Sequence, residues 1–246
     1  MDKMDRKAEK LSRIKEIGFM GKVAASLSHE IKNTLAIINE SVGLMGDLLR
    51  KDEPGDWAPY SRLTELMTSI EAQVQRSAEI EKRLNQFAHS MDKPLVELDL
   101  NETVRQTVML AQRFATLRRV KLEIELTSQP LCLLSDPFRL LYVIFGFVDR
   151  AINCTPKEGE VTVKTERSGE MSQVTVTDQG TVEAGEIKAL VSGSLSDEGE
   201  QSESDLTILA RTIEALGGTI GVEQGDGGGN TVILSFPAKR STTQPD

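Results

Sequence analysis

A histidine followed by a carboxylate stands out in this sequence as a pair that could do chemistry. The pair is His29 and Glu30, and the amide of Asn33 follows one helical turn later. A neutral imidazole is a nitrogen nucleophile, and a neighbouring carboxylate can hydrogen-bond one ring nitrogen while the other attacks. An imidazole in water has a pKa of about 6.5, so it is largely neutral at pH 7. The residue types therefore suit His29 to nucleophilic chemistry.

The helix that must carry this pair is predicted from a heptad pattern. Position a is taken by Ile17, Ala24, Ile31, Ile38 and Met45. Leu27 then falls at position d, and Leu35 and Val42 fall at e, so this stripe is expected to be buried. His29 takes position f, the most outward of the seven. We therefore expect the imidazole to face water instead of lying in a core or capping a helix end.

Two long helices are expected at the N-terminus. The first is predicted over residues 5–51, the proline and glycine of residues 52–56 break it, and the second covers residues 58–91. A hairpin of two amphipathic helices cannot cover its own apolar stripe. We therefore predict a homodimer whose hairpins form a four-helix bundle. The alternative is that the hairpin packs on the C-terminal half of its own chain.

Strands and helices alternate from Leu95 onward. Strands are predicted at residues 95–100, 120–126, 131–134, 161–166, 172–177, 219–223 and 231–236. Helices are predicted from a cap at Asn101 to residue 119, over 136–153 and over 205–216. The fold class is therefore α+β, a helical hairpin followed by an α/β sandwich with helices on one face of a mixed sheet. The expected domains are the hairpin at 1–93, the sandwich at 94–238 and a disordered tail at 239–246.

Composition and charge limit the classes of function that this chain can have. A net charge of −9 argues against a nucleic-acid surface. The longest apolar run, residues 140–148, is too short to span a bilayer, and no signal peptide is visible. Cys132 and Cys154 have no metal-site spacing and are expected to be reduced thiols. We therefore expect a cytoplasmic protein without a membrane span or a metal site.

Several fragments carry a family resemblance. Residues 29–33 (HEIKN) resemble the phosphoacceptor box of two-component histidine kinases, with Thr34 in place of the usual proline. Residues 136–140 (DPFRL), 176–180 (VTDQG) and 213–220 (IEALGGTI) resemble the ATP-binding domain that histidine kinases share with gyrases and heat-shock chaperones. The likeness covers about residues 10 to 237. It implies the sandwich fold of that ATPase type for the C-terminal part.

The resemblance also implies roles for matching residues. His29 would be the nucleophile, Glu30 its orienting base, and Asn33 the group that positions a water if the protein dephosphorylates its partner. The partners would be receiver domains of response regulators, which would bring the magnesium. The surface expected to meet a receiver domain is formed by Lys22, Ser26 and Lys32.

The nucleotide pocket departs from the family pattern. The resemblance implies two asparagines one turn apart, the second of which holds the magnesium that bridges the phosphates, but Gly146 and Arg150 stand at these positions. Neither can ligate a metal. Residues 176–180 resemble the box that contacts adenine in this family, and they keep its aspartate and its first glycine as Asp178 and Gly180. The phosphate lid has carboxylates, Glu203 and Asp205, at its two glycine positions. We therefore expect ATP to bind weakly or not at all, and no resident cofactor.

Three hypotheses follow. The favoured one is a histidine phosphotransfer protein that exchanges a phosphoryl group between His29 and receiver aspartates. The first alternative is an autophosphorylating histidine kinase with a divergent pocket, supported by Asp178 and Gly180. The second is a non-enzymatic adaptor, against which the intact His29–Glu30 pair argues. Residues 225–229 are glycine-rich but are predicted to be a hairpin turn, and His89 is given no catalytic role.

Overall fold

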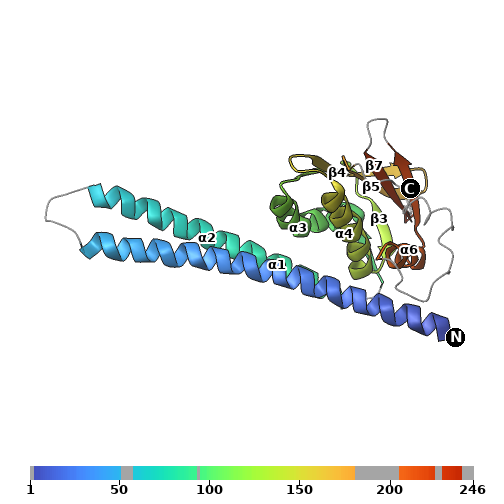
Figure 1. Cartoon of the computed structure of the whole chain (residues 1–246), viewed down its shortest axis with the longest axis horizontal. Helices are drawn as coiled ribbons and strands as arrows, with labels where there is room; N and C mark the ends of the chain where they lie inside the picture. Colours follow the sequence, from blue (N-terminus) through green and yellow to red (C-terminus); the bar gives the residue numbers. More distant parts are fainter. Residues whose placement is uncertain (1–2, 51–57, 93–94, 181–204, 225–228, 240–246) are drawn as a thin grey trace, which may run out of the picture. The chain divides into compact units, whose positions relative to one another are not determined.

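A computed structural model describes residues 3–50, 58–92, 95–180, 205–224 and 229–239 (Figure 1). The chain divides into two compact units. One consists of Met20–His89, and the other combines Met1–Phe19 with Ser90–Asp246. The units do not coincide with the predicted domains, because the first 19 residues are grouped with the α/β part and not with the hairpin.

The N-terminal hairpin consists of helix α1, Lys3–Arg50, and helix α2, Ala58–His89. Both agree closely with the predicted helices. From residue 20 onward the two helices lie side by side (Figure 1), with Leu27 of α1 and Ile80 of α2 buried. The predicted apolar stripe is only partly covered within one chain. Ile31, Ile38 and Met45 are half-buried, whereas Leu35 and Val42 are 55% and 52% exposed.

The α/β part begins with strand β1, Val96–Asp99, and helix α3, Leu100–Arg118. The predicted cap at Asn101 is wrong. Asp99 is the N-cap, and its side chain accepts a hydrogen bond from the Asn101 backbone nitrogen at 3.0 Å. The Asn101 side chain is instead buried, where its amide nitrogen donates to Gln129 O and its oxygen accepts from Thr165 Oγ1. Asn101 thereby ties α3 to the sheet.

Two sheets complete this part. Strand β1 pairs with β3, Cys132–Ser135, as a separate antiparallel ribbon. The main sheet has the order β2-β4-β5-β7-β6, with β2 parallel to β4 and every other neighbouring pair antiparallel. The strands of this sheet are β2 (Lys121–Glu125), β4 (Glu160–Ser168), β5 (Met171–Thr177), β6 (Thr219–Gln224) and β7 (Asn230–Pro237). This is the predicted mixed sheet, and helices lie on one face of it (Figure 1).

Helix α4, Pro137–Cys154, is the central element of the core. Asp136 caps it by accepting from the Arg139 backbone nitrogen at 3.0 Å, and proline occupies the first turn, where no backbone donor is needed. Eleven of its side chains are buried. Helix α6, Asp205–Ala215, packs against it and ends at Gly217, whose φ of +73° is the left-handed cap that glycine adopts without strain.

The first part of α1 belongs to this unit through an aromatic cluster. The Phe19 ring lies 4.9 Å from that of Phe145 and 5.5 Å from that of Tyr142, measured between centroids. Burial raises the pKa of the Tyr142 hydroxyl to about 12, and the carboxylates of Asp205 and Glu16 add to that shift. The cluster explains why residues before Met20 group with the α/β part.

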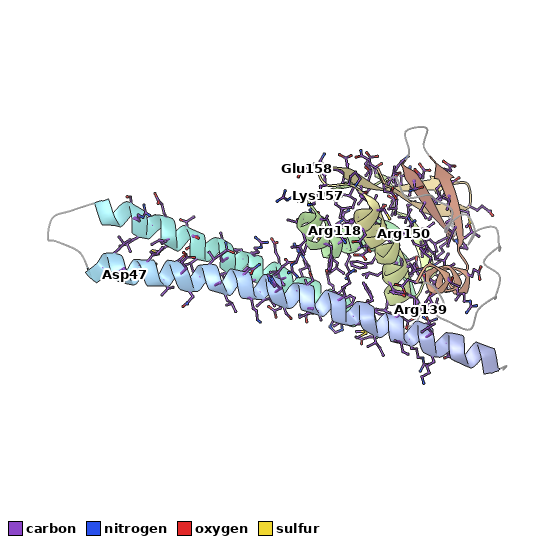
Figure 2. The ribbon with its side chains drawn as sticks, in the orientation of Figure 1. Asp47, Arg118, Arg139, Arg150, Lys157 and Glu158 are labelled. Atoms are coloured by element: carbon purple, nitrogen blue, oxygen red, sulfur yellow. The ribbon has the colours of Figure 1, made fainter. Side chains whose placement is uncertain are left out.

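The turn between α4 and β4 contains a strained residue. Glu158 has a φ of +65°, and Lys157 and Glu158 lie at the end of the α/β part where this turn reaches the surface (Figure 2). A left-handed conformation costs a residue with a Cβ about 1–2 kcal/mol, and glycine avoids this cost. Glu158→Gly is therefore expected to raise the free energy of unfolding by about 0.5–1 kcal/mol in urea titrations. Lys157→Gly, whose backbone needs no such conformation, should lower it instead, and a lower value for both variants would contradict the prediction.

Backbone hydrogen bonds hold the residues at the start of the predicted C-terminal tail. The backbone nitrogen of Ala238 donates to Glu170 O, and that of Lys239 donates to Cys132 O, both at 2.9 Å. The start of the tail is thus held against the sheets, and residues 240–246 lie outside the described part. Among the described residues, no helix is long and apolar enough to cross a membrane.

Candidate functional site

His29 lies in the middle of α1 with its side chain exposed. The outward position that the heptad frame predicted is therefore confirmed. The structure shows no hydrogen bond between the imidazole and Glu30 within the described residues. Successive residues on a helix point about 100° apart, so the carboxylate does not reach the ring in this conformation. Both ring nitrogens of His29 are open to a partner.

The neighbours of His29 differ in exposure. Asn33, Lys22 and Lys32 are exposed, as their predicted roles require, and Glu30 is half-buried. Ser26 is different, because its side chain is only 4% exposed. The expectation that Ser26 forms part of the receiver-facing surface is therefore wrong for this conformation. The heptad frame placed Ser26 near His29, but periodicity alone did not show that the residue is covered.

Thr34 and Ser77 form a hydrogen-bonded pair between α1 and α2. The Ser77 Oγ atom lies 3.0 Å from Thr34 Oγ1, and Thr34 Oγ1 donates to Ile31 O at 2.8 Å. Thr34 is 1% exposed and stands where the family usually has proline. Sequence reasoning noted Thr34 but missed Ser77, because the two positions are 43 residues apart and no short motif connects them.

The first degenerate pocket position, Gly146, is packed against Leu209 of α6. A Cβ placed on Gly146 would lie 2.6 Å from Leu209 Cδ1 and 2.7 Å from Cδ2. Leu209 is itself 5% exposed, so its side chain is part of the core. The space that the side chain of the family's first asparagine would occupy is thus filled by an apolar side chain. Gly146 itself offers no side-chain atom that could hold a phosphate or a metal ion.

Arg150 lies toward the opposite end of α4 from Arg139 (Figure 2). It is half-buried, and no ion pair joins it to another residue of the described part. Asp205, the second lid position, begins α6 and forms an ion pair with Lys15 of α1. Glu203 lies outside the described residues. A fixed cation and a carboxylate therefore stand at two separate positions where the family pattern has an uncharged amide and a glycine.

Asp178, the retained adenine-box residue, is held by the protein itself. Its Oδ1 atom accepts hydrogen bonds from the Gly180 nitrogen at 2.8 Å and from the Asn230 side-chain nitrogen at 3.3 Å. Asp178 is 2% exposed. Gly229 approaches so closely that an added Cβ would lie 2.2 Å from Asp178 O. This carboxylate therefore supports the packing of β7 on the end of β5.

The glycine-rich segment at 225–229 connects β6 and β7, which pair antiparallel with Gln224 opposite Asn230. It therefore joins two strands of a hairpin, as predicted, and does not open a helix. No group of three or more histidine, cysteine, aspartate or glutamate residues suited to a metal ion occurs in the part of the chain that the structure describes.

Comparison with known proteins shows what this chain is similar to. The model of the family described as "Histidine kinase-, DNA gyrase B-, and HSP90-like ATPase" matches residues 135–240. Sensor histidine kinase ZraS of Escherichia coli (strain K12) is 24% identical over 238 residues, which cover 96% of this chain and 50% of ZraS. Sensor protein DegM of Bacillus sp. (strain B21-2) is 22% identical over 222 residues, with 89% of this chain and 55% of DegM covered.

The chain therefore spans about half the length of the curated relatives it matches. Among solved structures, the catalytic domain of histidine kinase ThkA superposes with a TM-score of 0.51 at 23% sequence identity, covering 59% of this chain and 97% of that domain. This likeness shows the fold of the α/β part. The chain is thus similar to sensor histidine kinases over most of its length, and a helical N-terminal region precedes an α/β domain with the fold of the histidine kinase, gyrase and HSP90 ATPase type.

Proposed function

We propose that this chain is a histidine phosphotransfer protein, which exchanges a phosphoryl group between His29 and the aspartates of receiver domains. The observation that carries the proposal is the contrast between its two halves. The phosphoacceptor His29 is exposed on α1 and keeps both ring nitrogens available. The ATPase-type domain has Leu209 packed over Gly146, where the family has the first of its two pocket asparagines.

The transfer needs few groups on this side of the complex. A neutral ring nitrogen of His29 attacks the phosphorus of an aspartyl phosphate, an N–P bond forms and the O–P bond breaks, and the carboxylate leaves. The receiver domain supplies the magnesium that neutralises the phosphoryl oxygens. Glu30 orients the protonated ring nitrogen after a side-chain rotation, and the Lys22 and Lys32 cations attract the acidic receiver site. Asn33 positions water when the transfer ends in dephosphorylation.

Weak nucleotide binding forms the second part of the proposal. The packing of Leu209 on Gly146 leaves no ligand atom there, and Arg150 cannot coordinate a cation. One carboxylate oxygen of the retained Asp178, Oδ1, accepts hydrogen bonds from Gly180 and Asn230. We infer that the protein acts in the cytoplasm, where the thiols of Cys132 and Cys154 stay reduced.

A second candidate is an autophosphorylating histidine kinase with a divergent pocket. The family match over residues 135–240 and the retention of Asp178 and Gly180 favour it. A non-enzymatic adaptor is a third candidate, which the exposed His29 with Glu30 beside it in sequence disfavours. The three differ in where His29 obtains its phosphate, if it obtains any.

The deciding experiment uses two phosphate sources. The full chain and its His29→Ala variant are incubated with γ-labelled ATP and magnesium, and separately with a panel of receiver domains carrying labelled aspartyl phosphate. The phosphotransfer proposal expects label on the parent chain from receivers and none from ATP. Label from ATP on the parent alone would establish the kinase instead. A folded parent chain that takes label from neither source would leave the adaptor.

The exposed face of the hairpin supports a homodimer. Leu35, Val42 and Leu49 recur every seven residues on α1 and are 52–61% exposed, and Met67 and Val74 of α2 are each 52% exposed. Single exposed apolar residues are ordinary, but a heptad row on both helices is typical of an unpaired bundle seam. We propose that a second copy covers this row, as in a four-helix bundle, on the side of α1 away from His29.

Val42→Asp is expected to shift the protein from dimer to monomer in analytical ultracentrifugation, because the dimer would bury two unpaired charges in its seam. The loss in dimer affinity should be at least about 100-fold, the equivalent of about 3 kcal/mol. Leu44→Asp is the matched control, since Leu44 is 46% exposed on the opposite side of α1. Equal dissociation of both variants, or of neither, would contradict this dimer face.

A further inference from the structure

The hydroxyl pair of Thr34 and Ser77 is a point at which α1 is fixed to α2. The pair is buried on the α1 side, with Thr34 1% exposed. It lies just beyond the phosphoacceptor box, next to Asn33 in sequence and little more than one helical turn from His29. Nearby on the same side of α1, Ser41 is 5% exposed, so polar side chains as well as apolar ones are buried in the hairpin interior.

The bond between the two hydroxyls can persist with either direction of donation. Thr34 Oγ1 has Ile31 O within 2.8 Å, and Ser77 Oγ has Gln73 O within 2.9 Å. When Ser77 donates to Thr34, Thr34 donates to Ile31 O. When Thr34 donates to Ser77, Ser77 donates to Gln73 O. Each hydroxyl therefore keeps a partner in both arrangements, and the 3.0 Å link between the helices is retained.

Such a link fixes the rotation of α1 about its own axis. Thr34 faces α2, whereas His29 and Asn33 project from other sides of the same helix. With a helix radius of about 5–6 Å including side chains, a rotation of roughly 20° would move an outward side-chain tip by about 2 Å. Misplacement by about 1 Å can cost on the order of 100-fold in a positioned reaction.

We propose that Thr34 and Ser77 are positioning residues for phosphotransfer, which hold His29 and Asn33 in the orientation that a docked receiver domain needs. The inference rests on the proposed function of His29 and deepens it. Thr34 takes over at a position where the family usually has a proline, and a proline could not form this bond. Neither hydroxyl touches the transferred phosphoryl group.

The test separates the reactivity of His29 as a nucleophile from the effect of the Thr34–Ser77 bond on its orientation. Thr34→Val keeps the branched shape but removes the hydroxyl, and Ser77 can still donate to Gln73 O, so no buried donor is stranded. Thr34→Ser keeps the hydroxyl and should restore the link. Thr68→Val is the matched control, because the exposed Thr68 hydroxyl bonds only to Thr64 O of its own helix.

Two rates are measured on each variant: the rate at which His29 is loaded with phosphate, and the rate at which the loaded chain passes this phosphate to a receiver domain. Phosphoramidate, a small donor whose P–N bond breaks as ammonia leaves, loads His29 without a docking step. The loaded chains then discharge to the receiver domain that accepts phosphate from the parent fastest. Thr34→Val should load at the parent rate but discharge at least about 10-fold more slowly at saturating receiver, with half-saturation unchanged. Thr34→Ser and Thr68→Val should stay within about twofold of the parent.

The outcomes distinguish a failure of the positioning role of Thr34 and Ser77 from a failure of the proposed phosphotransfer function. If Thr34→Val discharges at the parent rate, the positioning role is wrong and the phosphotransfer function stands. The same holds if Thr34→Ser is as slow as Thr34→Val, since the hydroxyl would then not be the cause. If the parent is not phosphorylated on His29, or passes phosphate to no receiver of the panel, the proposed function fails and this inference fails with it.

Discussion

Replacing His29 with alanine is expected to reduce phosphohistidine formation to background, a loss of at least about 1,000-fold from any phosphoryl donor. The reason is chemical, because alanine has no atom that could accept the phosphoryl group. The measurement is acid-labile label on the full chain, with phosphoramidate or a phosphorylated receiver domain as donor. His89→Ala is the control, since His89 is the other histidine of the chain and lies exposed at the end of α2.

The fold should be insensitive to the same change. His29 is exposed, and no hydrogen bond joins its imidazole to a described residue, so the free energy of unfolding should change by less than about 0.5 kcal/mol. Alanine also favours the helix slightly more than histidine does. Label that survives in His29→Ala but disappears in His89→Ala would move the phosphoacceptor to α2 and overturn the assignment. A destabilised His29→Ala protein would give His29 a structural role.

The helices and strands were largely predictable because each carries its own periodicity. The α1 stripe, the alternation around Lys121–Glu125 and the proline at the start of α4 are local signals. The cap of α3 was not predictable in the same way. Asp99 and Asn101 are both residue types that favour the N-cap position of a helix. Which of them caps α3 depends on whether the other finds hydrogen-bond partners in the buried interior. The Asn101 side chain accepts a hydrogen bond from Thr165, which lies 64 residues away in the sequence.

The same limit applies to the site. The motif placed His29 correctly, because exposure on a helix follows from its phase relative to the apolar stripe. Ser26 was misplaced, since a heptad frame does not show how far a helix neighbour or another element extends over the adjacent face. The Thr34–Ser77 bond and the packing of Leu209 on Gly146 both join residues distant in sequence. A single sequence does not reveal such pairs.

The packing of Leu209 on Gly146 gives the second large prediction. Gly146→Asn restores the residue type of the family but places a side chain where Leu209 lies, and overpacking of a core costs about 1–3 kcal/mol of unfolding free energy. Leu209→Ala leaves a cavity and should cost about 2–5 kcal/mol. In the double variant, the asparagine occupies the space that the leucine vacated. The loss should therefore be smaller than the sum of the two by at least about 1 kcal/mol.

A double-mutant cycle in urea measures this coupling directly, and Gly43→Asn is its control. Gly43 is also in a helix, but an added Cβ there meets nothing within 4 Å, so the same substitution should not lower stability. Additive losses in the cycle would mean that Leu209 moves aside freely, and the argument for a filled pocket would fail. A coupled cycle would show that the loss of the ligand residue and the filling of its space are one structural change. Reverting Gly146 alone would then not restore nucleotide binding, because Leu209 would still occupy the space and Arg150 would still stand at the second ligand position.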